Sequence, residues 1–321
     1  MMVRPNIVIS KCIEHGHCRY DGSQINDSNV KQLMAFVNFI PLCPEMAIGL
    51  PSPRQSLRIV EKDQNEMLVF SLSGEEVTDQ MKSYALNQVQ QLKQMNVDGL
   101  LLKSKSPSCG IKDVKVYQSH GKVPKLPKKT KGIFGSIILE HFDHLSVEDE
   151  GRLLNYNIRE QFYTSIFTNA RYREVIKENN HKSLVAFHSN HKYLLMAYNQ
   201  NQLTVMGRIV ANHEHLELEE VLVKYGEALD KALKTPVSSS RNINVVLHIF
   251  GYFSKHLNTK EKAYFLDTLE HYRNKQLPFS SVMSILSSWV ARFEMDYLEN
   301  QVIFTPFPEA LINVTDSGKG I

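Results

Sequence analysis

Cysteine is scarce in this sequence, with four residues among 321. Because small domains stabilised by disulfides are rich in cysteine, so few argue against a disulfide framework. Roles as metal ligands, cluster ligands or nucleophiles remain open, as does the alternative that the cysteines are small buried side chains. The sequence has no Cys-x-x-Cys pair; its closest two are Cys12 and Cys18. The closely spaced ligand pair typical of structural zinc is therefore missing.

Long apolar runs are also missing. No stretch approaches the ~20 apolar residues that a membrane-spanning helix needs. The first ten residues, MMVRPNIVIS, have no small-residue cleavage site, so we read them as leading into a first strand and not as a signal peptide. We therefore expect a cytoplasmic protein without a membrane partner.

The chain carries no large excess of one charge, since its net charge is +3. Charge alone therefore does not indicate a nucleic-acid-binding protein. One local block stands out, because residues 111–135 contain a single acid, Asp113, and seven lysines. Such a block either binds phosphates or is a solvated loop. Its lysines are Lys112, Lys115, Lys122, Lys125, Lys128, Lys129 and Lys131.

The first 140 residues alternate between strand-like and helix-like segments. A polar segment with apolar residues at helical spacing covers residues 75–95. This alternation predicts an α/β domain over residues 1–140, with a mostly parallel sheet and helices on both faces. The strand-like segments cover residues 6–10, 36–42, 57–61, 67–72, 99–103 and 114–117.

From about residue 133 onward, the 3.6-residue apolar period dominates and glycine is sparse. We therefore expect an all-α domain over residues 141–321. Its predicted helices cover residues 147–178, 181–198, 202–213, 216–234, 239–256, 259–275 and 280–297.

Three cysteines follow predicted strands. Cys12 comes two residues after the first, Cys43 directly after the second, and Cys109 six residues after the strand at 99–103. If these strands are parallel neighbours, their carboxyl ends bring the three thiols to one edge. Soft thiolates bind zinc, copper(I) or iron–sulfur clusters. Three of them suit a cubane cluster with one iron lacking a protein ligand; zinc, a nucleophilic cysteine and inert cysteines stay open as alternatives.

Polar residues lie close to these cysteines in the sequence. Glu45 is two residues after Cys43 and suits acid–base chemistry, or it is simply a carboxylate at a helix start. Ser106 and Ser108 precede Cys109, where turn formation around Pro107 is the alternative explanation. Charged groups in Arg19-Tyr20-Asp21 and at Arg54 serve either a substrate or ordinary ion pairs.

These residues together form recognisable motifs. They are Ser10-Lys-Cys12, Cys18-Arg-Tyr-Asp-Gly22, Cys43-Pro-Glu45, Pro53-Arg54 and Lys103-Ser-Lys-Ser-Pro-Ser-Cys109-Gly110. In this order, over about 140 residues, they resemble the thiouracil desulfidase (TudS-type) family. The helical half, with Phe187-His188-Ser-Asn-His191 and Gly207-Arg208, resembles the YbgA-like domain often fused behind it.

The resemblance implies a [4Fe–4S] cluster on Cys12, Cys43 and Cys109, with the fourth iron open. It implies catalytic roles for Glu45 and for a serine, Ser106 first and Ser108 second. We further expect substrate contacts from Arg19, Tyr20, Asp21, Arg54, Lys128 and Lys129. The sequence departs from the family pattern at Cys18, where an aliphatic residue is usual. Cys18 is then either an apolar substitute or a fourth ligand that would close the open iron.

The implied activity is a desulfidase that removes sulfur from thiolated uracil, with 4-thiouridine in transfer RNA as the favoured substrate. Sulfur would bind the open iron, water would add to the carbon, and sulfide would leave without net redox change. A base inside transfer RNA would first leave its stack. The alternatives are an enzyme of free thiouracil-type molecules and a metal-stabilised binding protein without catalysis. A homodimer is an open alternative to a monomer.

Overall fold

The computed structural model describes residues 3–317. These divide into two compact units, one made of residues 3–170 with 308–317 and the other of residues 171–307. The predicted domain boundary after residue 140 stays a prediction. By packing, the segment from residue 141 to residue 170 belongs with the first unit. No helix in the described part of the chain is both long and apolar enough to cross a membrane.

The first unit contains a four-stranded, fully parallel sheet with the order β2-β1-β5-β8. Its strands are β1 (Asn6–Ser10), β2 (Asn38–Leu42), β5 (Gly99–Leu102) and β8 (Val147–Asp149). β5 is buried along its whole length, as expected of a strand covered on both faces. The predicted parallel α/β architecture is confirmed.

A second sheet, with the order β4-β3-β6-β7, holds the other strands. They are β3 (Leu57–Lys62), β4 (Asn65–Phe70), β6 (Val114–Tyr117) and β7 (Lys125–Thr130). β3 and β4 form an antiparallel hairpin through Asp63 and Gln64, both with positive φ. A two-residue turn of this kind matches the twist of the paired strands. The predicted strands at 57–61 and 67–72 therefore exist, but in this separate sheet.

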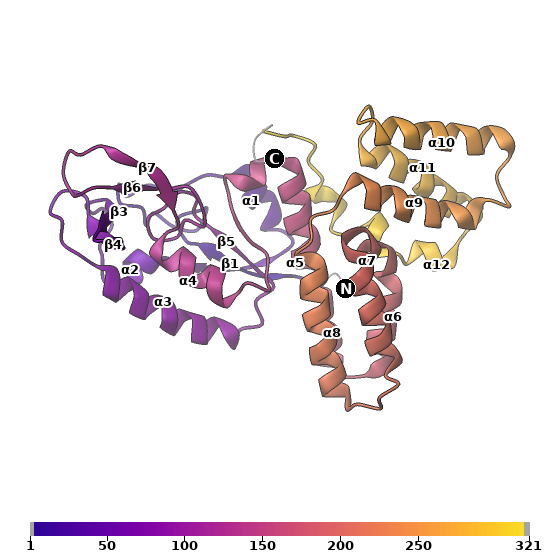
Figure 1. The fold of residues 1–321 in the computed structure, drawn as a ribbon, viewed down its shortest axis with the longest axis horizontal. Helices are drawn as coiled ribbons and strands as arrows, with labels where there is room; N and C mark the ends of the chain where they lie inside the picture. The colour runs from indigo at the N-terminus through magenta and orange to yellow at the C-terminus, as the bar shows by residue number, and fades with distance from the viewer. Residues whose placement is uncertain (1–2, 318–321) are drawn as a thin grey trace. The chain divides into compact units, whose positions relative to one another are not determined.

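Helices cover the parallel sheet. They are α1 (Ser28–Leu33), α2 (Pro44–Ala47), α3 (Thr78–Lys93), α4 (Ile133–His141) and α5 (Tyr156–Glu178). α3 and α4 pack side by side (Figure 1). Their apolar residues form one core with Val8, Leu100 and Leu102 of the sheet. On β5, a side chain at Gly99 would collide with Ile166 of α5, so strand and helix approach closely there.

The predicted helix at 147–178 is wrong in its first third. Residues 147–149 form β8, a short 3-10 turn η1 (Arg152–Leu154) follows, and α5 begins only at Tyr156. The cause is local capping, because the Asp149 carboxylate accepts the Arg152 N–H and the Asn155 side chain accepts the Ile158 N–H.

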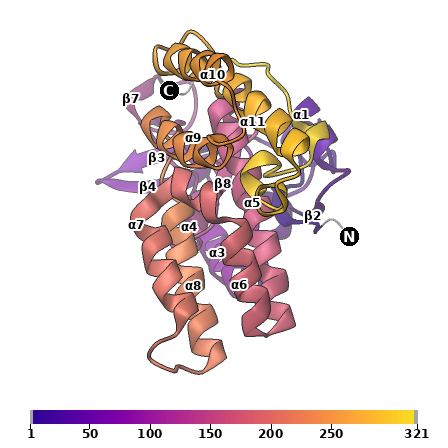
Figure 2. The same cartoon turned by 90° about the vertical axis from the view of Figure 1, so that its right-hand side faces the viewer.

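The second unit is helical, as predicted. Its helices after α5 are α6 (His181–Asn190), α7 (Lys192–Ala211), α8 (Leu218–Leu233), α9 (Ser239–Phe253), α10 (Thr259–Arg273), α11 (Phe279–Phe293) and α12 (Asp296–Glu299), followed by the turn η2 (Val302–Phe304). α7 and α8 run alongside each other (Figure 2). The predicted break near residue 200 appears as a kink at Asn199 inside α7, and the predicted helix at 280–297 ends early because Glu294 is left-handed.

Candidate active site

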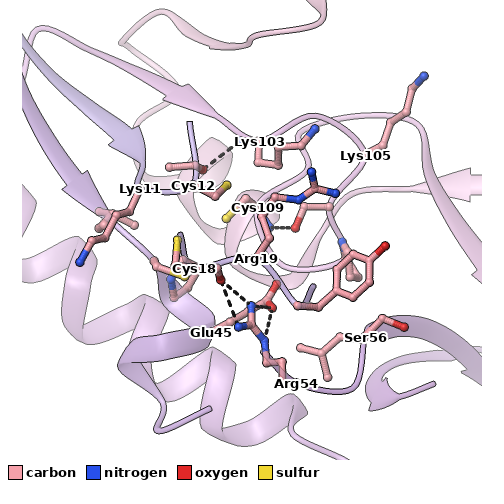
Figure 3. A pocket seen from close by; sticks show the side chains of 18 of the residues that line it. Lys11, Cys12, Cys18, Arg19, Glu45, Arg54, Ser56, Lys103, Lys105 and Cys109 are labelled. Carbon is pink, nitrogen blue, oxygen red and sulfur yellow. Dashed lines mark hydrogen bonds and ion pairs between the residues drawn. The ribbon is translucent and has the colours of Figure 1, made fainter. Parts of the chain in front are cut away.

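A cavity of about 260 Å³ lies where β1, β2 and β5 end. Because these strands are parallel and adjacent, their following loops meet at one edge. All four cysteines, Cys12, Cys18, Cys43 and Cys109, line the cavity. Figure 3 labels three of them, Cys12, Cys18 and Cys109. The predicted convergence of Cys12, Cys43 and Cys109 is therefore present in the structure, together with a fourth thiol.

The loop that carries Cys109 is shaped by its neighbours. The Ser106 hydroxyl oxygen accepts the N–H groups of Ser108 at 3.2 Å and Cys109 at 3.1 Å. Two glycines let the backbone approach closely, since a Cβ on Gly110 would lie 2.6 Å from the Ser106 carbonyl oxygen and one on Gly132 would lie 2.4 Å from that of Ser108. A larger residue at either position would push the loop, and Cys109 with it, out of place.

The thiols contact one another through Cys18. Its side chain is hydrogen bonded to the thiols of both Cys12 and Cys43. The hydrogen bond with Cys12, together with burial, raises the pKa of Cys18 to about 11. The hydrogen bond with Cys18 and then burial raise the pKa of Cys43, and burial raises that of Cys109. The thiols of Cys18, Cys43 and Cys109 are therefore protonated at neutral pH, and a bound metal centre would displace their protons.

The donors at this cavity are thiols, the ligand type that iron–sulfur clusters use. Within residues 3–317, no three histidine, cysteine or acidic side chains are arranged around one metal position. A single zinc ion needs all its donors around one point, whereas the thiolates of a cluster each bind a different iron. Soft thiols delivered by separate loops around one cavity match the second case.

Glu45 is held by two partners on either side of its carboxylate. Its Oε1 accepts the Ser108 hydroxyl at 2.8 Å, and its Oε2 accepts Arg54 Nε at 2.9 Å and also Arg54 Nη2. The Glu45 side chain lines the cavity and is 14% exposed. The guanidinium on one oxygen and the hydroxyl on the other hold the carboxylate in one orientation. The arrangement places a fixed base beside the thiols.

Arg54, predicted as a substrate contact, has protein partners for its whole guanidinium. Besides Glu45, its Nη1 and Nη2 donate to the Cys18 carbonyl oxygen at 3.1 Å, and Nη1 donates to that of Pro51 at 2.9 Å. Its side chain is 3% exposed. The substrate contact stays a prediction, while the geometry describes a residue that positions Glu45.

The two candidate serines have different surroundings. Ser106 lines the cavity, and its hydroxyl oxygen already accepts two backbone N–H groups. Ser108 is fully buried and donates to Glu45. Ser106 is therefore the serine placed to meet a ligand, and Ser108 is placed to orient Glu45. The sequence ranked them in this order but had no means to separate their roles.

One polar network at the cavity escaped sequence reasoning. The Glu150 carboxylate accepts Ser104 N–H at 2.8 Å, the Ser104 hydroxyl at 2.7 Å and Lys103 Nζ at 2.5 Å. Lys103 and Ser104 line the cavity, and Glu150 directly follows β8. Glu150 thus also follows the end of a parallel strand. Assigning residues 147–149 to a strand instead of a helix would have revealed it.

The predicted cationic contacts fall into two groups. Arg19 and Tyr20 line the cavity with Lys11 and Lys105, and Asp21 pairs with Arg19 at 3.8 Å without lining it. The other two predicted residues, Lys128 and Lys129, lie on β7, outside the residues that line this cavity. Lys128 pairs with Glu61 and with Glu66, and Lys129 pairs with Asp113 at 2.9 Å.

Comparison with known proteins separates the two halves of the chain. Residues 7–150 match the 2-thiouracil desulfurase family, and residues 192–308 match DUF1722, a family of unknown function. The uncharacterized protein YbgA of Escherichia coli (strain K12) is 25% identical over 137 residues, which cover 42% of this chain and 80% of YbgA. The uncharacterized protein YbbK of Bacillus subtilis (strain 168) is 29% identical over 109 residues, which cover 32% of this chain and 72% of YbbK.

One solved structure is also similar. It is that of the [4Fe–4S]-dependent thiouracil desulfidase TudS, with 26% identity, a TM-score of 0.38, and coverage of 47% of this chain and 93% of that one. The two family matches confirm the resemblance that the motifs of each half indicated.

Proposed function

We propose that this protein, whose residues 7–150 match the 2-thiouracil desulfurase family and whose residues 192–308 match DUF1722, is a desulfidase. Its cavity would bind a [4Fe–4S] cluster, and the enzyme would remove sulfur from thiolated uracil. Cys12, Cys43 and Cys109 would hold the cluster, and 4-thiouridine in transfer RNA is the favoured substrate. The observation that carries this proposal is the convergence of these thiols, from three parallel neighbouring strands, beside Glu45 and Ser106.

The proposed reaction replaces sulfur by oxygen. Water bonds to the thiocarbonyl carbon, the carbon–sulfur bond breaks, and sulfur leaves as hydrogen sulfide, so no oxidant or reductant is consumed. The cluster would supply Lewis acidity toward sulfur. Glu45 would take a proton from the attacking water, with Arg54 and Ser108 holding its carboxylate in place. The Ser106 hydroxyl would donate a hydrogen bond to the thiolated nucleobase and so orient it.

The rim of the cavity supports a substrate that carries phosphate. Lys11, Arg19 and Lys105 line it, and Tyr20 is 45% exposed beside them. Cationic side chains with an aromatic ring suit the backbone and the unstacked base of an RNA. Removing the base from its stack costs on the order of a few kcal/mol, which phosphate contacts would offset. We expect this activity in the cytoplasm, where thiols stay reduced.

A free thiouracil-type molecule is the second candidate substrate. The observation in its favour is that Lys128 and Lys129, in the lysine-rich block, are already paired with acids. Such pairing reduces the positive charge that this block presents to phosphates.

Protein prepared without oxygen tests the proposal directly. We expect iron and acid-labile sulfide in the wild type, and loss of both when Cys12, Cys43 or Cys109 is changed to Ala. Ser73→Ala is the control variant, because Ser73 is exposed and lies outside the residues that line the cavity. It should keep the iron and sulfide that Cys12→Ala loses. Colourless protein that contains zinc and no sulfide would instead favour a binding module, and loss of activity in only one Cys variant would favour a nucleophile.

Turnover separates the two substrates. Desulfidation of thiolated transfer RNA should fall steeply with salt, because phosphate contacts release counterions. Turnover of free 2-thiouracil should depend little on salt. Activity on the free base alone would exclude the RNA substrate and leave the desulfidase proposal intact.

A further inference from the structure

Cys18 brings a fourth thiol into the cavity. It is 2% exposed and lines the cavity together with the other three cysteines. Figure 3 shows it with Cys12 and Cys109. Its thiol is hydrogen bonded to those of Cys12 and Cys43. The sulfur of Cys18 thus lies in contact with two of the three proposed cluster ligands.

Cys18 belongs to the buried core residues, and its burial alone would also suit an apolar substitute. The contacts of its side chain and backbone are polar, however. Cys18 contacts two thiols, and its backbone carbonyl oxygen accepts both Nη atoms of Arg54 at 3.1 Å. An aliphatic side chain at this position would fill the space but leave the thiols of Cys12 and Cys43 without their common partner.

The backbone around Cys18 is fixed. Its N–H donates to the Gly16 carbonyl oxygen at 2.9 Å, and Arg54, which holds its carbonyl oxygen, is itself held by Glu45. The thiol is therefore delivered to the cavity by a defined loop, as the other three thiols are.

We infer that Cys18 is a fourth thiol ligand of the cluster, bound to the iron that Cys12, Cys43 and Cys109 leave without a protein ligand. This inference rests on the proposed cluster. Four cysteine thiolates are the usual ligand set of a [4Fe–4S] cluster, and iron in such a cluster favours thiolate over water. A substrate sulfur then competes with Cys18 for its position, so the site is guarded in the absence of substrate.

Loss of one iron on oxidation tests this ligand without measuring activity. Full-length wild type and Cys18→Ala are loaded with iron and sulfide without oxygen and then exposed briefly to ferricyanide. An iron held by three cluster sulfides alone is released, which leaves a [3Fe–4S] cluster with its own electron paramagnetic resonance signal. We expect this signal and the loss of iron in Cys18→Ala, with both much weaker in the wild type. Equal conversion in the two proteins overturns the inference.

Two controls keep the result unambiguous. If Cys18→Ala binds no iron, the comparison passes to Cys18→Ser, whose hydroxyl keeps the size of the side chain but is a poor iron ligand. Release of the iron from Cys18→Ser then supports the inference, and retention equal to that of the wild type contradicts it. If the wild type itself binds neither iron nor sulfide, the proposed cluster fails, which is a different outcome from equal conversion.

Discussion

The two units of this protein use their polar side chains in different ways. In the first unit, thiols, Glu45 and cations surround an open cavity after parallel strands. In the second unit, polar side chains take part in the packing of the core. His191, for example, stacks on Phe187 and donates Nδ1–H to its carbonyl oxygen at 2.8 Å. The cavity of this unit, about 540 Å³, is lined by no cysteine, histidine or basic side chain within the described residues.

The difference has a structural cause. Strands that end at one edge release their loops around a common space, so side chains from distant segments meet without filling it. Helices that pack along their length bury one face each, so the polar side chains on those faces, such as that of His191, take part in the core. The comparison teaches that reactive groups should be sought where parallel strands end. A histidine motif on helices can instead be part of the packed core.

The largest expected effect is on catalysis in the first unit. We predict that Glu45→Gln lowers kcat for a thiolated uracil by ~10²–10⁴-fold, as removal of a general acid–base group does. Iron content should remain at the wild-type level, because Glu45 binds none of it. The matched control, Glu270→Gln, makes the same change on an exposed helix of the second unit. Equal kcat in the two variants would remove Glu45 from the reaction.

An intermediate effect is expected on the stability of the second unit. Burial lowers the pKa of His191 to about 3, and its Nε2 has no hydrogen-bond partner in the described chain. The neutral ring is therefore favoured in the folded state. As pH falls from about 6.5 toward 3, the unfolded state takes up a proton that the folded state does not, so stability falls with pH by an amount on the order of a few kcal/mol.

Urea unfolding at pH 7 and pH 4 measures this loss. His191→Phe removes the titrating group and should reduce the pH dependence, whereas His213→Phe, outside the core, should retain it. Equal pH dependence in wild type and His191→Phe would show that the buried ring is not responsible.

The smallest effect should come from the lysine-rich block. Because Lys128 already pairs with Glu61 and Glu66, Lys128→Ala should change stability by less than about 1 kcal/mol and leave the salt dependence of RNA binding almost unchanged. Lys105→Ala, at the exposed rim of the cavity, should reduce the slope of log affinity against log salt by about 0.7–1. A larger change for Lys128 would restore the block as the phosphate contact.

Much of the fold was predictable because its periodicities are local. The buried run at β5 and the alternation of strands with a helix predicted the parallel sheet, and the 3.6-residue period predicted the helical unit. The start of α5 could not be predicted in this way, because a pattern of apolar residues does not show that Asn155 caps the helix. The hairpin of β3 and β4 was read as two strands, but their separate sheet depends on long-range pairing with β6.

The sequence by itself determined which groups are available: three cysteines after three strands, Glu45 close to one of them, and serines before another. Only the tertiary structure decided how they are used. In the structure, Ser108 and Arg54 bind the Glu45 carboxylate, and Cys18 contacts Cys12 and Cys43. Glu150 lies at the cavity network after β8, and Lys128 pairs with acids. The physical reason is that strand ends are set by local pattern, whereas contacts between loops depend on sheet order and on backbone geometry that distant residues fix.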